Sequence, residues 1–187
     1  MKRMKRIPFL FLSVLLFCAA LFSACAQETA AEPSLREKLN RSVQSSRMTY
    51  SATLFNGEFT LAEEIAVYTR GDSGAELTLT RTTLAEDIAA ESPYETTSFT
   101  TAITESAYEA VAILPFDETA ADCTESADGS VLLSVADPAA FFRTQDAAEY
   151  SDVSVKIEFA FDRPVSCRVE FYLPSGNSAV IVYTYSY

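Results

Sequence analysis

The sequence predicts an α+β domain in which a curved antiparallel β-sheet of about seven to nine meandering strands is covered by two or three short helices. Apolar and polar residues alternate over residues 48–83 and again from residue 153 to the C-terminus, with short turns between the alternating runs. Two segments with helix-start signals precede or interrupt these runs. Strands joined by such short turns run antiparallel, and the helices supply the cover that one face of the sheet needs.

The first helix is predicted over residues 34–46. Ser34 and Glu37 stand three residues apart, as in a capping box, where each side chain accepts a hydrogen bond from the other residue's backbone. Leu35, Leu39 and Val43 then recur on one helical face. We expect this apolar stripe to cover the sheet.

Three strands of a meander are predicted next, over residues 48–54, 58–70 and 75–83. Asn56-Gly57 predicts a hairpin turn between the first two strands. Residues 84–93 fit either a helical turn or a connection.

In the middle of the chain, three further strands are predicted over residues 94–101, 108–114 and 131–135. A second helix is predicted over residues 138–148. Asp137 and Pro138 suit the N-cap and the first position of that helix. Its Phe141 and Phe142 are expected to dock on the sheet.

An acidic segment at residues 117–129 is predicted to be a solvated polar loop, with a calcium site as the alternative. The spacing of its acids lacks the alternating ligands, central glycine and terminal glutamate of an EF-hand loop. The sequence therefore predicts neither a metal site nor a cofactor. The acids are Asp117, Glu118, Asp122, Glu125 and Asp128.

The last third of the chain carries the clearest strand pattern. Turns are predicted at residues 162–164 and 174–177, so three antiparallel strands end the chain. Their predicted apolar faces comprise Val153, Val155, Ile157, Phe159, Phe161, Val165, Cys167, Val169, Phe171, Leu173, Ile181, Tyr183, Tyr185 and Tyr187.

The chain is strongly acidic, with 14 basic and 26 acidic residues and a formal net charge of −12. Four of the basic residues lie within the N-terminal leader, so the remainder carries 10 basic against 26 acidic residues, or −16. Such a surface repels phosphate backbones, and we expect no nucleic-acid partner. The acidity favours solubility, and a basic partner or a cation-rich wall polymer is the alternative.

Residues 1–24 have the layout of a secretory signal peptide: a basic start, an apolar run and a small-residue end. The run is short for a transmembrane helix, which is the main alternative. Leu21-Phe22-Ser23-Ala24-Cys25 resembles the bacterial lipobox, with Phe22 at the position where leucine is usual. The resemblance implies that the thiol of Cys25 receives a diacylglyceryl group and that Cys25 becomes the new N-terminus.

A lipidated Cys25 predicts a protein anchored at the extracytoplasmic face of a bacterial membrane. Two acyl chains anchor a protein stably in a bilayer, whereas a single chain anchors it only marginally. Residues 25–33 are then the lipidated N-terminus and its polar tether, and residues 34–187 form a single domain. Cleavage after Ala26, with Ala24-Cys25-Ala26 as an A-x-A site, is the alternative and would leave a secreted protein.

The chain has four cysteines. Cys18 lies inside the apolar run of the leader and Cys25 is the predicted lipidation site, so Cys123 and Cys167 are the two cysteines of the folded domain. An even pair of cysteines in an exported domain is a disulfide candidate. Two unpaired thiols are the alternative. A metal site is disfavoured because the chain has no histidine.

This order of elements on a lipoprotein resembles the superfamily of periplasmic lipoprotein carriers and mycobacterial lipid-binding lipoproteins. The resemblance implies a half-open β-barrel closed by helices, with a cavity that could accept an acyl chain. Ile157, Phe159, Val169 and Phe171 are then the candidate lining residues, and an ordinary closed core is the alternative. A cystatin-like or other α+β sheet would produce the same pattern.

The sequence predicts no enzyme and no catalytic residues. Without histidine, neither a Ser-His-Asp nor a Cys-His arrangement can be built. The chain also lacks a G-x-S-x-G motif, a phosphate loop and a glycine-rich nucleotide signature. We therefore expect a protein that binds a lipid or another hydrophobic ligand. A structural or protein-interaction module displayed on the cell envelope is the alternative.

Overall fold

The computed structural model describes residues 32–72, 74–84 and 93–187. The predicted signal peptide, the lipidation site Cys25 and nearly all of the tether lie outside the described residues, as does most of the ambiguous segment 84–93. The compact unit runs from Ser34 to Tyr187.

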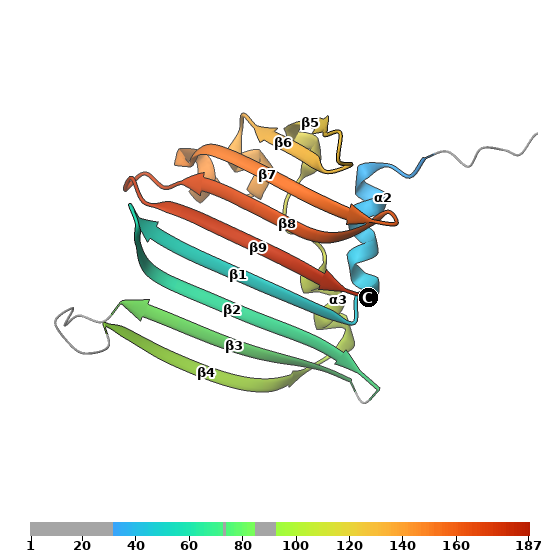
Figure 1. Ribbon diagram of the computed structural model, residues 1–187, viewed down its shortest axis with the longest axis horizontal. Coiled ribbons are helices and arrows are strands. Elements are labelled where there is room, and N and C mark those ends of the chain that lie inside the picture. Colours follow the sequence, from blue (N-terminus) through green and yellow to red (C-terminus); the bar gives the residue numbers. More distant parts are fainter. Residues whose placement is uncertain (1–31, 73, 85–92) are drawn as a thin grey trace, which may run out of the picture. The chain divides into compact units, whose positions relative to one another are not determined.

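In the described part of the chain, nine strands form one curved, open antiparallel sheet in the order β4-β3-β2-β1-β9-β8-β7-β6-β5 (Figure 1), which confirms the predicted fold class. The first and last strands pair side by side, so the two halves of the chain join in the middle of the sheet. Strands β4 and β5 are the two edges. The bounds are β1 Arg47–Asn56, β2 Phe59–Gly71, β3 Gly74–Leu84, β4 Tyr94–Ile103, β5 Ala121–Glu125, β6 Val131–Val135, β7 Ser151–Ala160, β8 Arg163–Tyr172 and β9 Ser178–Ser186.

Short helices cover one face of this sheet (Figure 1), here called the inner face. Ser34 and Glu37 form the predicted capping box at the start of the first helix, whose last part is a 3₁₀ turn. Asp137 and Pro138 occupy the predicted N-cap and first position of the later helix. The helices are α2 Leu35–Asn40 with η1 Arg41–Gln44, α3 Glu105–Ala112, η2 Glu118–Ala120, and α4 Pro138–Phe142 with η3 Gln145–Glu149.

The strand predicted over residues 108–114 is wrong, because α3 occupies this place. Thr104 caps the helix, since its side-chain oxygen accepts a hydrogen bond of 3.2 Å from the backbone N–H of Ala107. Tyr108 and Ala112 stand one turn apart, and both are fully buried. The short apolar run therefore follows the helical period once a cap starts it.

The acidic segment 117–129 is not a continuous loop. It contains η2 and the edge strand β5, which pairs with β6 so that Cys123 faces Leu133. Polar residues are compatible with this strand because it lies at an edge, where most of its side chains meet solvent.

The predicted apolar face of β7 ends before Phe161. Phe161 is 99% exposed, and it and Asp162 both have positive φ angles, 51° and 59°. These two residues, and not residues 162–164, form the turn into β8, which already begins at Arg163.

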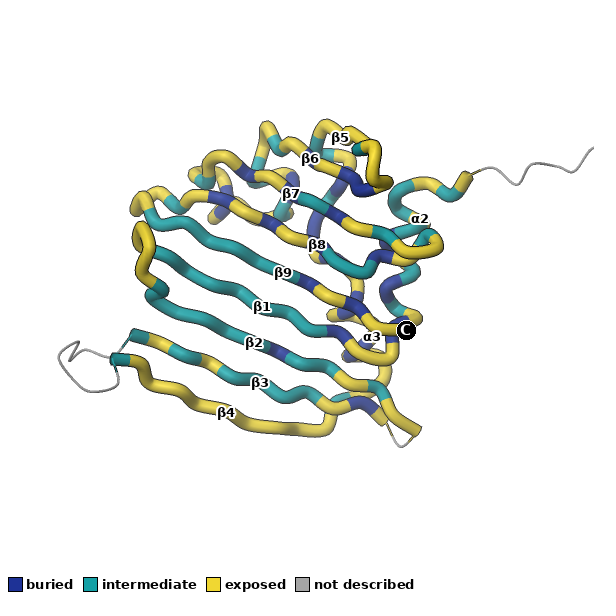
Figure 2. The backbone as a smooth tube through the Cα atoms, viewed as in Figure 1, coloured by how far each residue is buried: buried dark blue, intermediate teal, exposed yellow. Residues whose placement is uncertain are grey.

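The closed core lies mainly between the helices and strands β6 to β9, with Met48 of β1 and Ala75 of β3 at its border. Phe141 of α4 is fully buried and stacks on Phe116 with ring centroids 4.8 Å apart. The other half of the sheet is less covered: Figure 2 shows β1 to β3 as mainly half-buried and β4 as exposed. Most apolar burial therefore occurs at one end of the inner face, and the other end is open.

Candidate ligand-binding groove

The open end of the inner face carries two neighbouring hollows, which together we call the groove. The first has a volume of about 350 Å³ and lies between α3 and the sheet, against Met48, Tyr50, Tyr68, Val111 and Tyr183. The second, of about 320 Å³, lies farther along the same strands and is lined mainly by Ala52, Leu54, Ala62, Phe171, Ala179 and Ile181. Glu64 lines both hollows.

Strand register brings these side chains together. Tyr50 pairs with Tyr183 of β9 and with Ala66 of β2, and Ala52 pairs with Ile181 and Glu64 in the same way. Residues directly opposite one another in an antiparallel pair share a face. The floor of the groove is therefore built from two segments that lie more than a hundred positions apart in the sequence.

The lining is mainly apolar, but three tyrosines bring hydroxyl groups into it. The rings of Tyr50 and Tyr183 lie 5.4 Å apart between centroids, and Tyr68 lines the same hollow. Burial, followed by the charge of Glu64, raises the pKa of Tyr50 and Tyr68. Burial likewise raises the pKa of Tyr183. Within the described part of the chain, none of the three hydroxyls makes a hydrogen bond, so each could donate to a ligand.

One ion pair stands on the flank of the groove. Arg81 of β3 lies directly opposite Glu64 of β2, and its Nε and Nη2 donate to Glu64 Oε2 at 3.1 and 2.5 Å. The Arg81 side chain is 60% exposed and that of Glu64 is 32% exposed. A pair this open to water contributes about 0–1 kcal/mol to stability, so a ligand could rearrange it at little cost.

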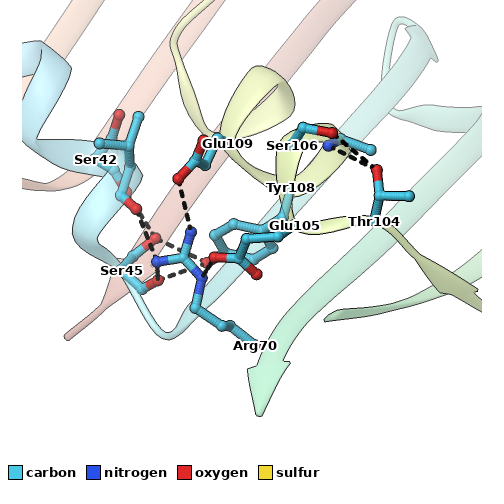
Figure 3. A network of polar contacts seen from close by, with 10 residues as sticks. Ser42, Ser45, Arg70, Thr104, Glu105, Ser106, Tyr108 and Glu109 are labelled. Carbon is cyan, nitrogen blue, oxygen red and sulfur yellow. Dashed lines mark hydrogen bonds and ion pairs between the residues drawn. The ribbon is translucent and has the colours of Figure 1, made fainter. Parts of the chain in front are cut away.

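Arg70 holds α3 over the groove. Its guanidinium lies 4.4 Å from the ring centroid of Tyr108, and its Nε is 2.6 Å from Glu105 Oε1 (Figure 3). Its Nη1 donates to the backbone carbonyl of Val43 at 3.0 Å. One side chain of β2 therefore binds both α3 and the end of η1.

Two tyrosine hydroxyls complete this attachment. Tyr108 donates to the backbone carbonyl of Ser45 at 3.0 Å, and Tyr185 of β9 donates to the carbonyl of Ala112 at 3.1 Å. All of these groups are buried, where a polar group left unpaired is costly. The wall that α3 forms beside the groove is thus fixed in the middle of the helix, through Tyr108, and at its C-terminal end, through Ala112.

The four predicted lining residues lie in different parts of the structure. Ile157 and Val169 are fully buried in the closed core, and Phe159 packs against it. Phe171 alone among them lines the groove. The lining residues of β1 and β2 were not predicted, although Tyr50, Glu64 and Tyr68 on neighbouring predicted strands offered a signal.

Cys123 and Cys167 do not form the predicted disulfide, because both thiols are free. Cys123 is exposed on the edge strand β5 and Cys167 is buried on β8, with β6 and β7 between them. Strands lie about 4.8 Å apart, so three such steps far exceed the Cα separation of about 6 Å that a disulfide requires.

The acidic residues near η2 make ion pairs. Arg36 Nη2 lies 2.5 Å from Glu118 Oε2, and Arg143 Nη2 lies 3.2 Å from Asp117 Oδ2. Among the residues that the structure describes, no group of three or more acidic or cysteine side chains is placed to hold a metal ion.

No model of a known protein family matches the sequence, and no curated protein matches it either. Within the described ranges, no helix combines the length and the apolar character needed to cross a membrane.

Proposed function

We propose that this protein is a membrane-anchored extracytoplasmic lipoprotein that binds a lipid or another hydrophobic ligand in the groove. The observation that carries this proposal is the open inner face over β1, β2 and β9, where small and apolar side chains form a floor that α3 borders but does not fill. Ligand sites are typically concave and mostly apolar, with a few convergent polar groups. The groove combines these properties.

The binding test compares co-purifying lipid in two variants of the full chain. Ala62→Phe places a ring in the groove, and Ser51→Phe places the same ring on the outer face of the neighbouring strand. We expect the wild-type protein and Ser51→Phe, extracted in mild detergent, to carry bound lipid in native mass spectra, and Ala62→Phe to carry several-fold less. A lipid-free wild-type spectrum, or equal lipid in both variants, would reject lipid binding in the groove.

The anchor has a separate test. Cys25→Ser removes the thiol that would be acylated, so we expect this variant to leave the membrane fraction while wild-type protein stays in it. Processed Cys25→Ser protein that still sediments with membranes would contradict lipid anchoring.

An interaction module on the cell envelope is the second candidate function, and the edge strand β4 favours it. Nine of the ten residues of β4 are exposed, and Glu95 is its single charged residue. Such an edge can pair with an extended segment of another chain. A photo-crosslinker in place of Ser98 should then capture one defined partner in cells, while one in place of Glu125 on the opposite edge should not.

A further inference from the structure

We infer that the groove selects a zwitterionic phospholipid whose headgroup carries a protonated primary amine, with Glu64 binding the ammonium and Arg81 the phosphate. This inference rests on the proposed function, and it adds the class of ligand.

The charge of the groove is the first reason. Glu64 and Arg81 are the charged side chains that face it among the described lining residues. Glu63 also borders the second hollow, but it pairs with Thr53 and its side chain lies on the outer face. Their charges sum to zero. A headgroup with one positive and one negative group complements them, whereas a purely anionic headgroup meets the Glu64 carboxylate and a chain whose residues 25–187 carry a net charge of −16.

The unused hydrogen-bonding capacity of the pair is the second reason. Both bonds from Arg81 go to Oε2 of Glu64, so within the described residues Glu64 Oε1 remains an open acceptor and Arg81 Nη1 an open donor. An ammonium group carries three donors and a phosphate carries only acceptors at neutral pH. Each half of the headgroup therefore has a matching partner.

The position of the pair is the third reason. Arg81 of β3 is more than half exposed, while the apolar floor lies one or more strands away, on β2, β1, β9 and β8. A lipid bound here keeps its headgroup in water and its acyl chains on the floor. The hydroxyls of Tyr50 and Tyr68, close enough to Glu64 to interact with its charge, can donate to the ester oxygens between the headgroup and the chains.

The test offers the full-length protein in detergent an equimolar mixture of phosphatidylethanolamine, phosphatidylcholine and phosphatidylglycerol with identical acyl chains. Bound lipids are then quantified by mass spectrometry. Phosphatidylcholine is the informative competitor, because its quaternary ammonium has no N–H to donate to Glu64. We expect phosphatidylethanolamine to be enriched roughly tenfold over phosphatidylglycerol and several-fold over phosphatidylcholine, the effect of one or two charge-assisted hydrogen bonds.

Two variants assign the preference to the pair. Glu64→Gln should abolish the preference for phosphatidylethanolamine over phosphatidylcholine while lipid still binds. Arg81→Gln should weaken binding of all three phospholipids. The matched control Arg168→Gln breaks the Arg168–Glu170 ion pair on the outer face and should leave the preference unchanged.

The possible failures are distinguishable. Bound lipid that mirrors the mixture, or an unchanged preference in Glu64→Gln, overturns this inference and leaves lipid binding intact. Enrichment of phosphatidylglycerol overturns it as well. A wild-type protein that takes up no lipid overturns the proposed function itself. The wild-type ratios decide the matter even if a variant fails to fold.

Discussion

The hydroxyl of Tyr185, on the last strand, donates a hydrogen bond of 3.1 Å to the backbone carbonyl of Ala112, the last residue of α3. The C-terminal end of the sequence thereby holds the helix that borders the groove. The carbonyl groups in the last turn of a helix have no partner within the helix, so this bond satisfies one of them. This bond adds to the packing of the fully buried Tyr108 and Ala112, which attaches α3 to the sheet.

Tyr185→Phe should lower the free energy of unfolding by about 1 kcal/mol, because it removes one buried hydrogen bond and leaves a carbonyl unsatisfied. Urea denaturation measures this change, and hydrogen exchange should show faster opening of α3. Tyr172→Phe is the control, since that ring is exposed and its hydroxyl makes no hydrogen bond within the described residues. Equal stability of the two variants would contradict the role of Tyr185.

Arg70→Ala should destabilise the domain by about 2 kcal/mol, because it removes the ion pair to Glu105, the contact with Tyr108 and the bond to the Val43 carbonyl together. Arg70→Lys should recover only part of this loss, since an ammonium can neither stack flat on the ring nor reach as many acceptors.

The exposed Arg168 supplies the comparison for Arg70. Arg168→Ala should change the free energy of unfolding by no more than about 0.5 kcal/mol. A full rescue by Arg70→Lys would show that charge alone matters at residue 70.

Replacing Phe141 or Phe161 with alanine should have very different effects on stability. Phe141 is fully buried, so Phe141→Ala should cost about 3–5 kcal/mol through lost burial and the cavity that remains. Phe161 is 99% exposed in a turn, so Phe161→Ala should change the free energy of unfolding by less than about 0.5 kcal/mol. Thermal or urea denaturation of both variants provides the check, and comparable losses would place Phe161 in a contact that this fold does not contain.

Alkaline pH should destabilise the domain. Burial raises the pKa of the Cys167 thiol from 9.0 to about 12, and burial also raises the pKa of Tyr183 and Tyr185 above the usual tyrosine value. An acid whose pKa is raised by folding stabilises the native state fully below its unfolded pKa. That stability is lost as the pH climbs toward the folded value. For Cys167 the loss therefore falls between pH 9 and about pH 12.

The contribution of Cys167 is measured by the pH dependence of urea denaturation. Near pH 10 the free energy of unfolding should fall more steeply in the wild type than in Cys167→Ala, by about 1 kcal/mol per pH unit. Cys123→Ala removes an exposed thiol instead and is the matched control. Parallel curves for the wild type and Cys167→Ala would contradict the assignment.

Local patterns in the sequence were sufficient to predict most of the helices and strands. Ser34 with Glu37, and Asp137 with Pro138, start helices through side chains that lie within three residues of the groups they bind. The alternation from Val153 onward predicted β7 to β9, because one face of each strand must be covered. The period was misjudged at residues 108–114, where seven residues are too few to separate strand from helix without the cap at Thr104.

The sequence by itself thus determined the α+β class, the antiparallel strands, the helix starts and the strongly acidic charge, all of which depend on composition or on neighbours along the chain. Only the tertiary structure decided that β1 pairs with β9, which sets Tyr50 beside Tyr183 and makes the floor of the groove. It also decided that two strands separate Cys123 from Cys167. The physical reason is that pairing between remote strands is chosen by the burial and hydrogen bonding of the whole sheet, and no local pattern carries that information.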